Sequence, residues 1–141
     1  MKIIILCLCF LLCGCQTSFQ KDNMDLNQLK ETLYEYFEYP MSEDITSLKE
    51  PLQSQLNQVD DKLVLSSPFS YPKEVCMIVH SNDKKWLSYF QAYLKQLQSE
   101  YPDIDKKAYQ SQNVKIGTIY QYTYFIVSKN QAQITKYLLG M

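Results

Sequence analysis

The chain has 141 residues, of which 46% are hydrophobic and 21% are charged, and its formal net charge is −1 at pH 7. This length fits one domain, and a chain with 12 Tyr, 6 Phe and only 3 Gly is neither compositionally disordered nor collagen-like. Arginine is absent and the 14 lysines are outnumbered by 15 acidic residues, so we expect no nucleic-acid partner.

Residues 1–14 have the features of a secretion signal. Lys2 supplies a positive start, and residues 3–13 form an apolar run of 11 residues. A membrane-spanning helix needs roughly 17–25 apolar residues, so this run predicts a cleaved leader rather than a membrane span. A buried apolar N-terminal helix is the alternative interpretation.

The leader ends Leu12-Cys13-Gly14-Cys15, which resembles the lipobox of bacterial lipoproteins. The resemblance implies that a diacylglyceryl group is attached to the sulfur of Cys15 and that cleavage leaves Cys15 as the new N-terminus. Two acyl chains hold a protein stably on a bilayer, at about 0.8 kcal/mol per buried methylene. We therefore expect a lipoprotein anchored to the outer face of the bacterial cell membrane. An ordinary signal peptide with a coincidental cysteine is the alternative.

Residues 15–24 are predicted to be the lipidated cysteine and a polar tether, and residues 25–141 a single domain. Nine flexible residues reach roughly 15–18 Å, which keeps the domain close to the membrane. Three of the five cysteines lie in the leader, so only Cys15 and Cys76 remain and no disulfide framework is expected.

The first half of the domain predicts two helices and two strands. Apolar residues at positions 26, 29, 33 and 37 have helical spacing, with Asp25 as the cap. A second helical stripe covers residues 48–59, where Pro51 is tolerable only near the first turn. Strands are predicted at 62–66 and 74–80, separated by a connector with two prolines. The continuous apolar run at 75–79 predicts a central strand covered on both faces.

The second half predicts one long helix, two strands and a last helix. Large apolar residues recur at helical spacing over residues 83–101, with Ser81 or Asp83 as the cap, and Pro102 ends the helix. Residues 113–120 and 122–128 are rich in β-forming side chains around a reversal near Gln121. A final helix closes at Gly140. The order predicts an α+β domain with about four largely antiparallel strands and helices packed on the sheet.

Residues from about 26 to the end resemble a family of small Gram-positive lipoproteins catalogued as a domain of unknown function. The matching stretches are EVCMIVH at 74–80, NVKIGTIYQYTYFIVS at 113–128 and the closing KYLL at 136–139. Usual members have a small residue such as Ala near the start of the central strand, where this chain has Val75 and Cys76. The resemblance implies an α+β lipoprotein domain, but no catalytic residues to carry over.

Two residues of the central strand are candidates for chemistry. His80 is the only histidine, and no further ligand follows at metal-binding spacing, so it is interpreted as a polar strand-end residue and no metal or other cofactor is expected. Cys76 lies between Val75 and Met77, and we expect a buried hydrophobe rather than a reactive thiol.

Acidic pairs occur at Glu43-Asp44, at Asp60-Asp61 and at positions 103 and 105. A glycosidase needs two carboxyl groups that face each other across a cleft, and adjacency in sequence does not provide this arrangement. We interpret the pairs as caps and solvated turns. Gly117 is the only glycine between positions 14 and 140, so the chain also lacks a glycine-rich phosphate loop.

Tyr120, Tyr122 and Tyr124 would share one face of a strand if no turn intervenes. Tyrosine is enriched at interfaces, and its ring also fills small cores while the hydroxyl reaches water. These three residues are therefore either core residues or a candidate binding surface.

Together these features favour a membrane-anchored, non-catalytic binding or accessory domain that engages an envelope protein or polymer. The alternative hypothesis is a small anchored hydrolase that acts on an envelope substrate through carboxylates such as Asp60 or Asp61. Two facing acids in a cleft would favour the hydrolase.

Overall fold

The computed structural model describes residues 23–101 and 103–140, with residues 103–105 described by their backbone alone. The helices are α1 (Leu26–Leu33), α2 (Leu52–Asn57), α3 (Lys85–Glu100) and α4 (Gln131–Leu139). The strands are β1 (Lys62–Ser66), β2 (Val75–His80), β3 (Val114–Ile119) and β4 (Tyr122–Val127). Short 3₁₀ helices are η1 (Tyr34–Tyr36), η2 (Ile45–Ser47), η3 (Asp103–Tyr109) and η4 (Ser111–Asn113).

The four strands form an antiparallel sheet in the order β1-β2-β4-β3, which confirms the predicted α+β class. β2 pairs with β1 on one side and with β4 on the other. All of its residues except His80 are buried, so the apolar run does mark a central strand covered on both faces. β3 and β4 form a hairpin that reverses at Tyr120 and Gln121, as predicted.

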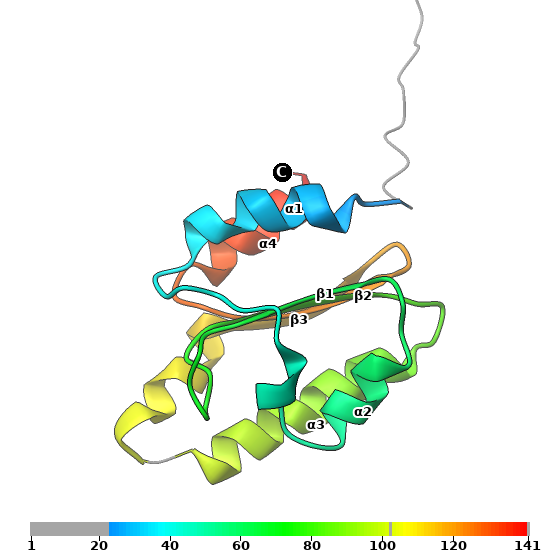
Figure 1. Ribbon diagram of the computed structural model, residues 1–141. Helices are drawn as coiled ribbons and strands as arrows, with labels where there is room; N and C mark the ends of the chain where they lie inside the picture. The colour runs from blue at the N-terminus through cyan, green and yellow to red at the C-terminus, as the bar shows by residue number, and fades with distance from the viewer. Residues whose placement is uncertain (1–22, 102, 141) are drawn as a thin grey trace, which may run out of the picture.

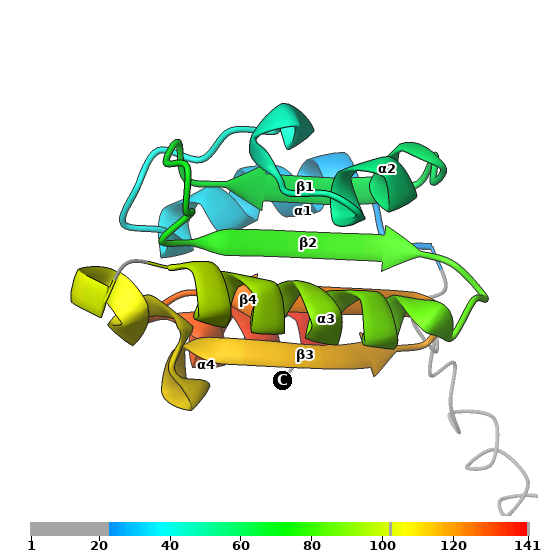
Figure 2. The same cartoon turned by 90° about the horizontal axis from the view of Figure 1, so that it is seen from below.

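Helices cover both faces of the sheet. Figure 1 shows α1 and α4 on one face and α2 and α3 on the other, and Figure 2 looks onto the α3 side. Successive side chains of a strand point to opposite faces, so the sheet contributes to two hydrophobic clusters. Phe90 and Phe125 belong to the cluster under α3, and Leu33, Cys76 and Leu138 to the cluster under α1 and α4.

Helix ends follow local chemistry. The Asp25 carboxylate accepts two backbone N–H groups of the first turn of α1 at 3.1 Å each, as predicted for a cap. At the start of α3, Asp83 accepts the N–H of Lys85 at 2.9 Å. Gly140 ends α4 in the left-handed region, with φ 70°.

The first two helices are shorter than the apolar spacing predicts. α1 ends at Leu33 and continues as η1. The stripe at 48–59 produces only the short helix α2, because Pro51 lacks an N–H donor and disfavours helical backbone in the residue before it. Leu48 still packs in the core, at 3% exposure, although it lies outside the helix.

Candidate functional site

A buried carboxylate, that of Glu74, joins three chain segments at one end of the sheet. Glu74 directly precedes β2 and is 3% exposed. Its Oε1 accepts hydrogen bonds from the backbone N–H groups of Glu38 and Tyr39 at 2.7 and 3.0 Å, and its Oε2 accepts one from the Ser128 hydroxyl at 2.6 Å. Donors of this kind are what allow a carboxylate to be buried. Hydrogen bonds to Glu74 therefore join the α1–β1 connection and the end of β4 to the start of β2.

The connection between β1 and β2 is held by further hydrogen bonds. Ser67 Oγ accepts from the backbone N–H groups of Lys73 and Glu74 at 2.8 and 3.1 Å. The Tyr109 hydroxyl donates to the carbonyl of Pro72 at 2.6 Å, which ties η3 to the same connection. These bonds fix the position of Lys73 at the rim of a pocket.

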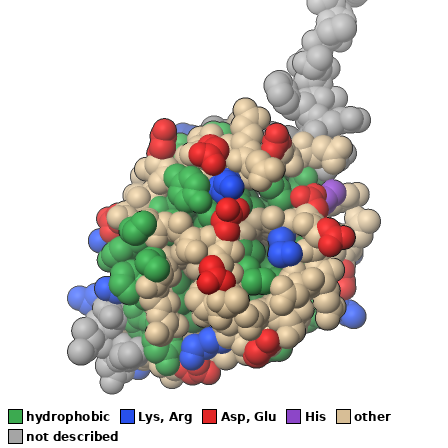
Figure 3. Space-filling view, viewed as in Figure 1, with side chains coloured by type: hydrophobic (Ala, Val, Ile, Leu, Met, Phe, Trp, Pro, Cys, Tyr) green, Lys and Arg blue, Asp and Glu red, His purple; other side chains and the backbone are tan. Residues whose placement is uncertain are grey.

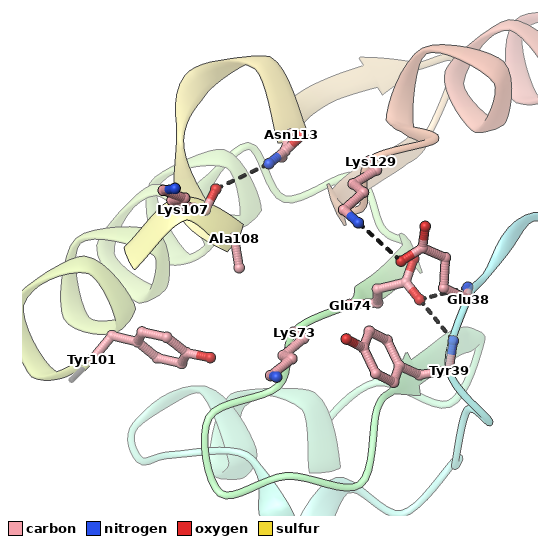
Figure 4. A pocket seen from close by; sticks show the side chains of 9 residues that line it. All are labelled: Glu38, Tyr39, Lys73, Glu74, Tyr101, Lys107, Ala108, Asn113 and Lys129. Carbon is pink, nitrogen blue, oxygen red and sulfur yellow. Dashed lines mark hydrogen bonds and ion pairs between the residues drawn. The ribbon is translucent and has the colours of Figure 1, made fainter. Parts of the chain in front are cut away.

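The pocket has a volume of about 210 Å³ and is shown in Figure 4. Its lining comes from segments far apart in the sequence, and consists of Glu38, Tyr39, Lys73, Glu74, Tyr101, Lys107, Ala108, Asn113 and Lys129. This volume lies below the range of about 300–1,000 Å³ that is usual for small-molecule and cofactor sites. The pocket therefore suits one small group rather than a whole cofactor.

Three lysines surround the pocket, and their surroundings differ. Lys129 Nζ lies 3.3 Å from Glu38 Oε2 in an exposed ion pair, which contributes little to stability. The Lys73 side chain is half-buried, and its Nζ lies 5.7 Å from the ring centroid of Tyr39 and 5.3 Å from that of Phe69. Among the described residues, neither Lys73 nor Lys107 has a carboxylate within 4.0 Å.

The Tyr101 ring lines the pocket and packs against two further tyrosines. The rings of Tyr71 and Tyr101 meet edge to face with centroids 5.2 Å apart, and those of Tyr101 and Tyr109 do the same at 4.7 Å. Lys49 Nζ lies 4.4 Å from the Tyr71 ring centroid. The two ring contacts hold the Tyr101 ring in a fixed orientation beside the pocket.

The sequence did not single out this site, because no motif spans it. Glu74 does carry a signal, since it is a charged residue next to a strand whose two faces are both predicted to be buried. A carboxylate at such a position needs several donors, but the sequence does not reveal that these come from Glu38, Tyr39 and Ser128.

The structure separates the three tyrosines that the sequence singled out. Tyr122 and Tyr124 are 1% and 4% exposed, in the cluster under α1 and α4. Tyr120 is 63% exposed in the β3–β4 turn, with φ 52°. The prediction of a binding surface made of these three tyrosines is therefore wrong. β4 is an inner strand covered on both faces, and two of the three rings are core residues.

His80 lies at the end of the sheet opposite the pocket. Its Nδ1 is 2.7 Å from Asp61 Oδ2, its Nε2 is 3.1 Å from Gln121 Oε1, and its ring stacks on that of Tyr122 with centroids 4.5 Å apart. A hydrolase of the Ser-His-Asp type needs a nucleophile at the second ring nitrogen, where this chain has an amide. The described residues also contain no group of three side chains suited to hold a metal ion.

Cys76 is completely buried in β2, as predicted. Burial raises the pKa of its thiol to about 12, because the thiolate would lose its hydration. The side chain therefore acts as a small core residue and not as a nucleophile.

Three of the acidic residues noted in the sequence, Glu43, Asp44 and Asp61, have local partners in the structure. Glu43 forms a surface ion pair. Asp44 accepts the backbone N–H of Thr46 at 2.8 Å, and hydrogen bonds from Thr46 lower the pKa of this carboxyl. The side chains of Asp103 and Asp105 lie outside the described residues.

The leader, Cys15 and most of the tether also lie outside the described residues. In the part that is described, no helix combines the length and apolar character needed to cross a membrane. Comparison of the chain with models of protein families, with curated proteins and with solved structures found no match.

Proposed function

We propose that this protein is a membrane-anchored extracytoplasmic lipoprotein whose domain is a non-catalytic binding module of the bacterial cell envelope. The anchor is Cys15, because it follows an apolar leader and the small residue Gly14. Two acyl chains on one cysteine provide stable membrane attachment without a spanning helix.

The tether enters at one end of the sheet and the pocket lies at the other, which supports a domain that is anchored on one side and binds on the other. The backbone N–H of Met24, where the tether meets the domain, donates to the Tyr122 hydroxyl at 2.8 Å. Tyr122 pairs with His80 at one end of β2, whereas Glu74 and the pocket lie at the other end. Five residue steps of about 3.4 Å place these ends about 17 Å apart. In Figures 1 and 2 the chain likewise enters beside one end of the sheet, while η3, in yellow, lies at the other.

The state of Glu74 is the observation that favours binding over catalysis. A carboxylate that acts as a general acid or base must exchange a proton with a substrate within hydrogen-bond distance. Glu74 already accepts three hydrogen bonds from protein groups and is 3% exposed. The pocket thus has lysine and tyrosine side chains for contact, but its two carboxylates do not form a free pair.

Fatty-acid labelling tests the anchor. In a bacterium that expresses the chain, labelled palmitate should be incorporated into the wild-type protein and the protein should fractionate with membranes. Cys15→Ala should abolish both results, whereas Cys9→Ala in the same leader should change neither. Labelling of the Cys15→Ala protein would contradict the anchor.

Photo-crosslinking in intact cells tests the binding role. A photoreactive residue at position 107, at the pocket, should capture an envelope component, and the same residue at position 95, on α3 outside the pocket, should not. The absence of capture, combined with turnover of an envelope polymer by the purified protein, would favour the anchored hydrolase instead.

A further inference from the structure

Among the residues that the structure describes, the charge of Lys73 is only weakly compensated. Its side chain is half-buried, and its ammonium group faces the rings of Tyr39 and Phe69 and has no described carboxylate at ion-pair distance. Partial burial of a cation is unfavourable unless aromatic rings, an anion or water offset the lost hydration. Figure 4 shows Lys73 extending into the space between Tyr39 and Tyr101. An anion in this space would complete the surroundings of the ammonium.

The other charges of the pocket leave a positive excess. Lys73, Lys107 and Lys129 face only two glutamates, although the whole chain has a net charge of −1. Glu74 is occupied by three protein donors, and Glu38 is occupied by its exposed pair with Lys129. A bound anion would therefore have Lys73 and Lys107 available, and could draw Lys129 from a weak pair.

The geometry points to a phosphate group carried by an envelope polymer as the ligand of this pocket, an inference that rests on the proposed function. Lysine ammonium groups bind phosphate as point charges, without the planar fork of arginine. The three lysines come from the β1–β2 connection, from η3 and from the residue after β4. A phosphodiester in a polymer has two charged oxygens and two ester oxygens in a tetrahedral arrangement, so donors from several segments can approach it from different directions, whereas the two oxygens of a carboxylate lie in one plane.

The position of the pocket favours a polymer over the lipid headgroups of the anchoring membrane. The tether joins the domain at Met24, beside Tyr122, at the far end of the sheet. The pocket therefore lies on the side of the domain opposite the point where the tether enters. Phe69, which is 39% exposed beside Lys73, provides an apolar surface for the unit that carries the phosphate.

The test is equilibrium binding to the purified full-length chain in a neutral detergent, taken from whichever cell fraction contains it. Poly(glycerol phosphate) is the polymeric phosphate probe, polygalacturonate is the matching carboxylate polymer, and phosphatidylglycerol in mixed micelles is the headgroup probe. We expect saturable binding of poly(glycerol phosphate) that weakens as salt is raised, because ions screen the attraction. Polygalacturonate should bind more weakly.

Variants link the binding to the pocket. Lys73→Met should weaken binding about ten- to a hundredfold, which is the range for loss of a charged hydrogen bond. Lys73→Arg keeps the charge and should retain most of the affinity. Lys95→Met, exposed on α3, should have no effect. Each variant should keep a cooperative urea transition, and if Lys73→Met does not fold, Lys107→Met replaces it as the test.

Several results would overturn the inference. These are the absence of saturable binding, equal binding by the wild type and the folded lysine variant, and a preference for polygalacturonate. Displacement of the polymer by phosphatidylglycerol would assign the site to a lipid headgroup and reject a polymer ligand. If phosphate fails while the crosslinker at position 107 still captures an envelope component, the proposed function stands and the ligand class is wrong.

Discussion

Replacement of Glu74 provides the sharpest stability test of the structure. Glu74→Ala removes the acceptor of two backbone N–H groups and of the Ser128 hydroxyl, at distances of 2.7, 3.0 and 2.6 Å. A hydrogen bond to a charged group contributes about 1.5–3 kcal/mol, and water that enters beside the pocket offsets part of the loss. We expect a decrease of about 3–5 kcal/mol in the free energy of unfolding, the range for breaking a buried polar network.

Glu74→Gln separates the loss of hydrogen bonds from the loss of charge. The amide oxygen still accepts from Glu38 and Tyr39, and the amide NH₂ faces Ser128, whose hydroxyl can turn to accept. The expected decrease is about 1–2 kcal/mol. Glu35→Ala, at an exposed position of η1, is the control and should change stability by less than about 0.5 kcal/mol.

Urea unfolding followed by the fluorescence of Trp86, which is 4% exposed, measures all three variants. The variants should rank as Glu74→Ala, Glu74→Gln and Glu35→Ala, from most to least destabilised. A decrease below about 1 kcal/mol for Glu74→Ala would refute the role of Glu74 in joining the three segments. Equal losses for the Ala and Gln variants would refute the reasoning from acceptor geometry.

Three further predictions concern the core. Gly117→Ala should destabilise the protein by about 1–3 kcal/mol in thermal melts, because the Cβ of the alanine would lie 2.6 Å from Cζ of Tyr124. In a Tyr124→Leu background this loss of stability should be smaller. An unchanged loss would contradict the clash. Tyr93→Phe should not lower the urea midpoint, because the buried Tyr93 hydroxyl has no hydrogen-bond partner among the described residues. A loss above about 1 kcal/mol would contradict this reasoning. Burial raises the pKa of Cys76 from 9.0 to about 12, so this thiol favours the folded state below pH 9 and the contribution is lost between pH 9 and 12. Cys76→Ala should flatten the dependence of the free energy of unfolding on pH in this range. An unchanged dependence would contradict this assignment.

The strands could be predicted from sequence because their signals are local. The range predicted for β1 is the observed one, and the apolar run at 75–79 identified β2 as central, since both of its faces had to be covered. Helix lengths were harder to predict. The apolar spacing at 48–59 indicates which side chains face the core, but Pro51 limits the backbone that can be helical, so Leu48 is buried without being part of α2.

The candidate site could not be predicted because it depends on contacts between distant residues. Glu38 and Ser128 meet at Glu74 although they lie 36 and 54 residues from it in the sequence. The tyrosine pattern was ambiguous for a related reason. Alternation shows that Tyr122 and Tyr124 share a face, but only the packing of α1 and α4 shows that this face is buried.

The composition predicts no strongly basic surface, because acidic residues outnumber lysines. On the face seen in Figure 3, acidic and basic side chains are mixed rather than gathered into one basic area. The positive excess at the pocket is therefore a local feature that three lysines from separate segments create. A ligand for this site would be recognised by that local arrangement and not by the overall charge, which is −1.

The most direct test of a binding site at the pocket is an NMR titration of the full-length chain in neutral detergent with poly(glycerol phosphate). The predicted result is a saturable set of amide shift changes at Tyr39, Lys73 and Lys107, which line the pocket. The amides of His80 and Tyr120, at the opposite end of the sheet, should not shift. Shift changes centred on His80 and Tyr120, or no saturable change at the pocket, would contradict the proposed site.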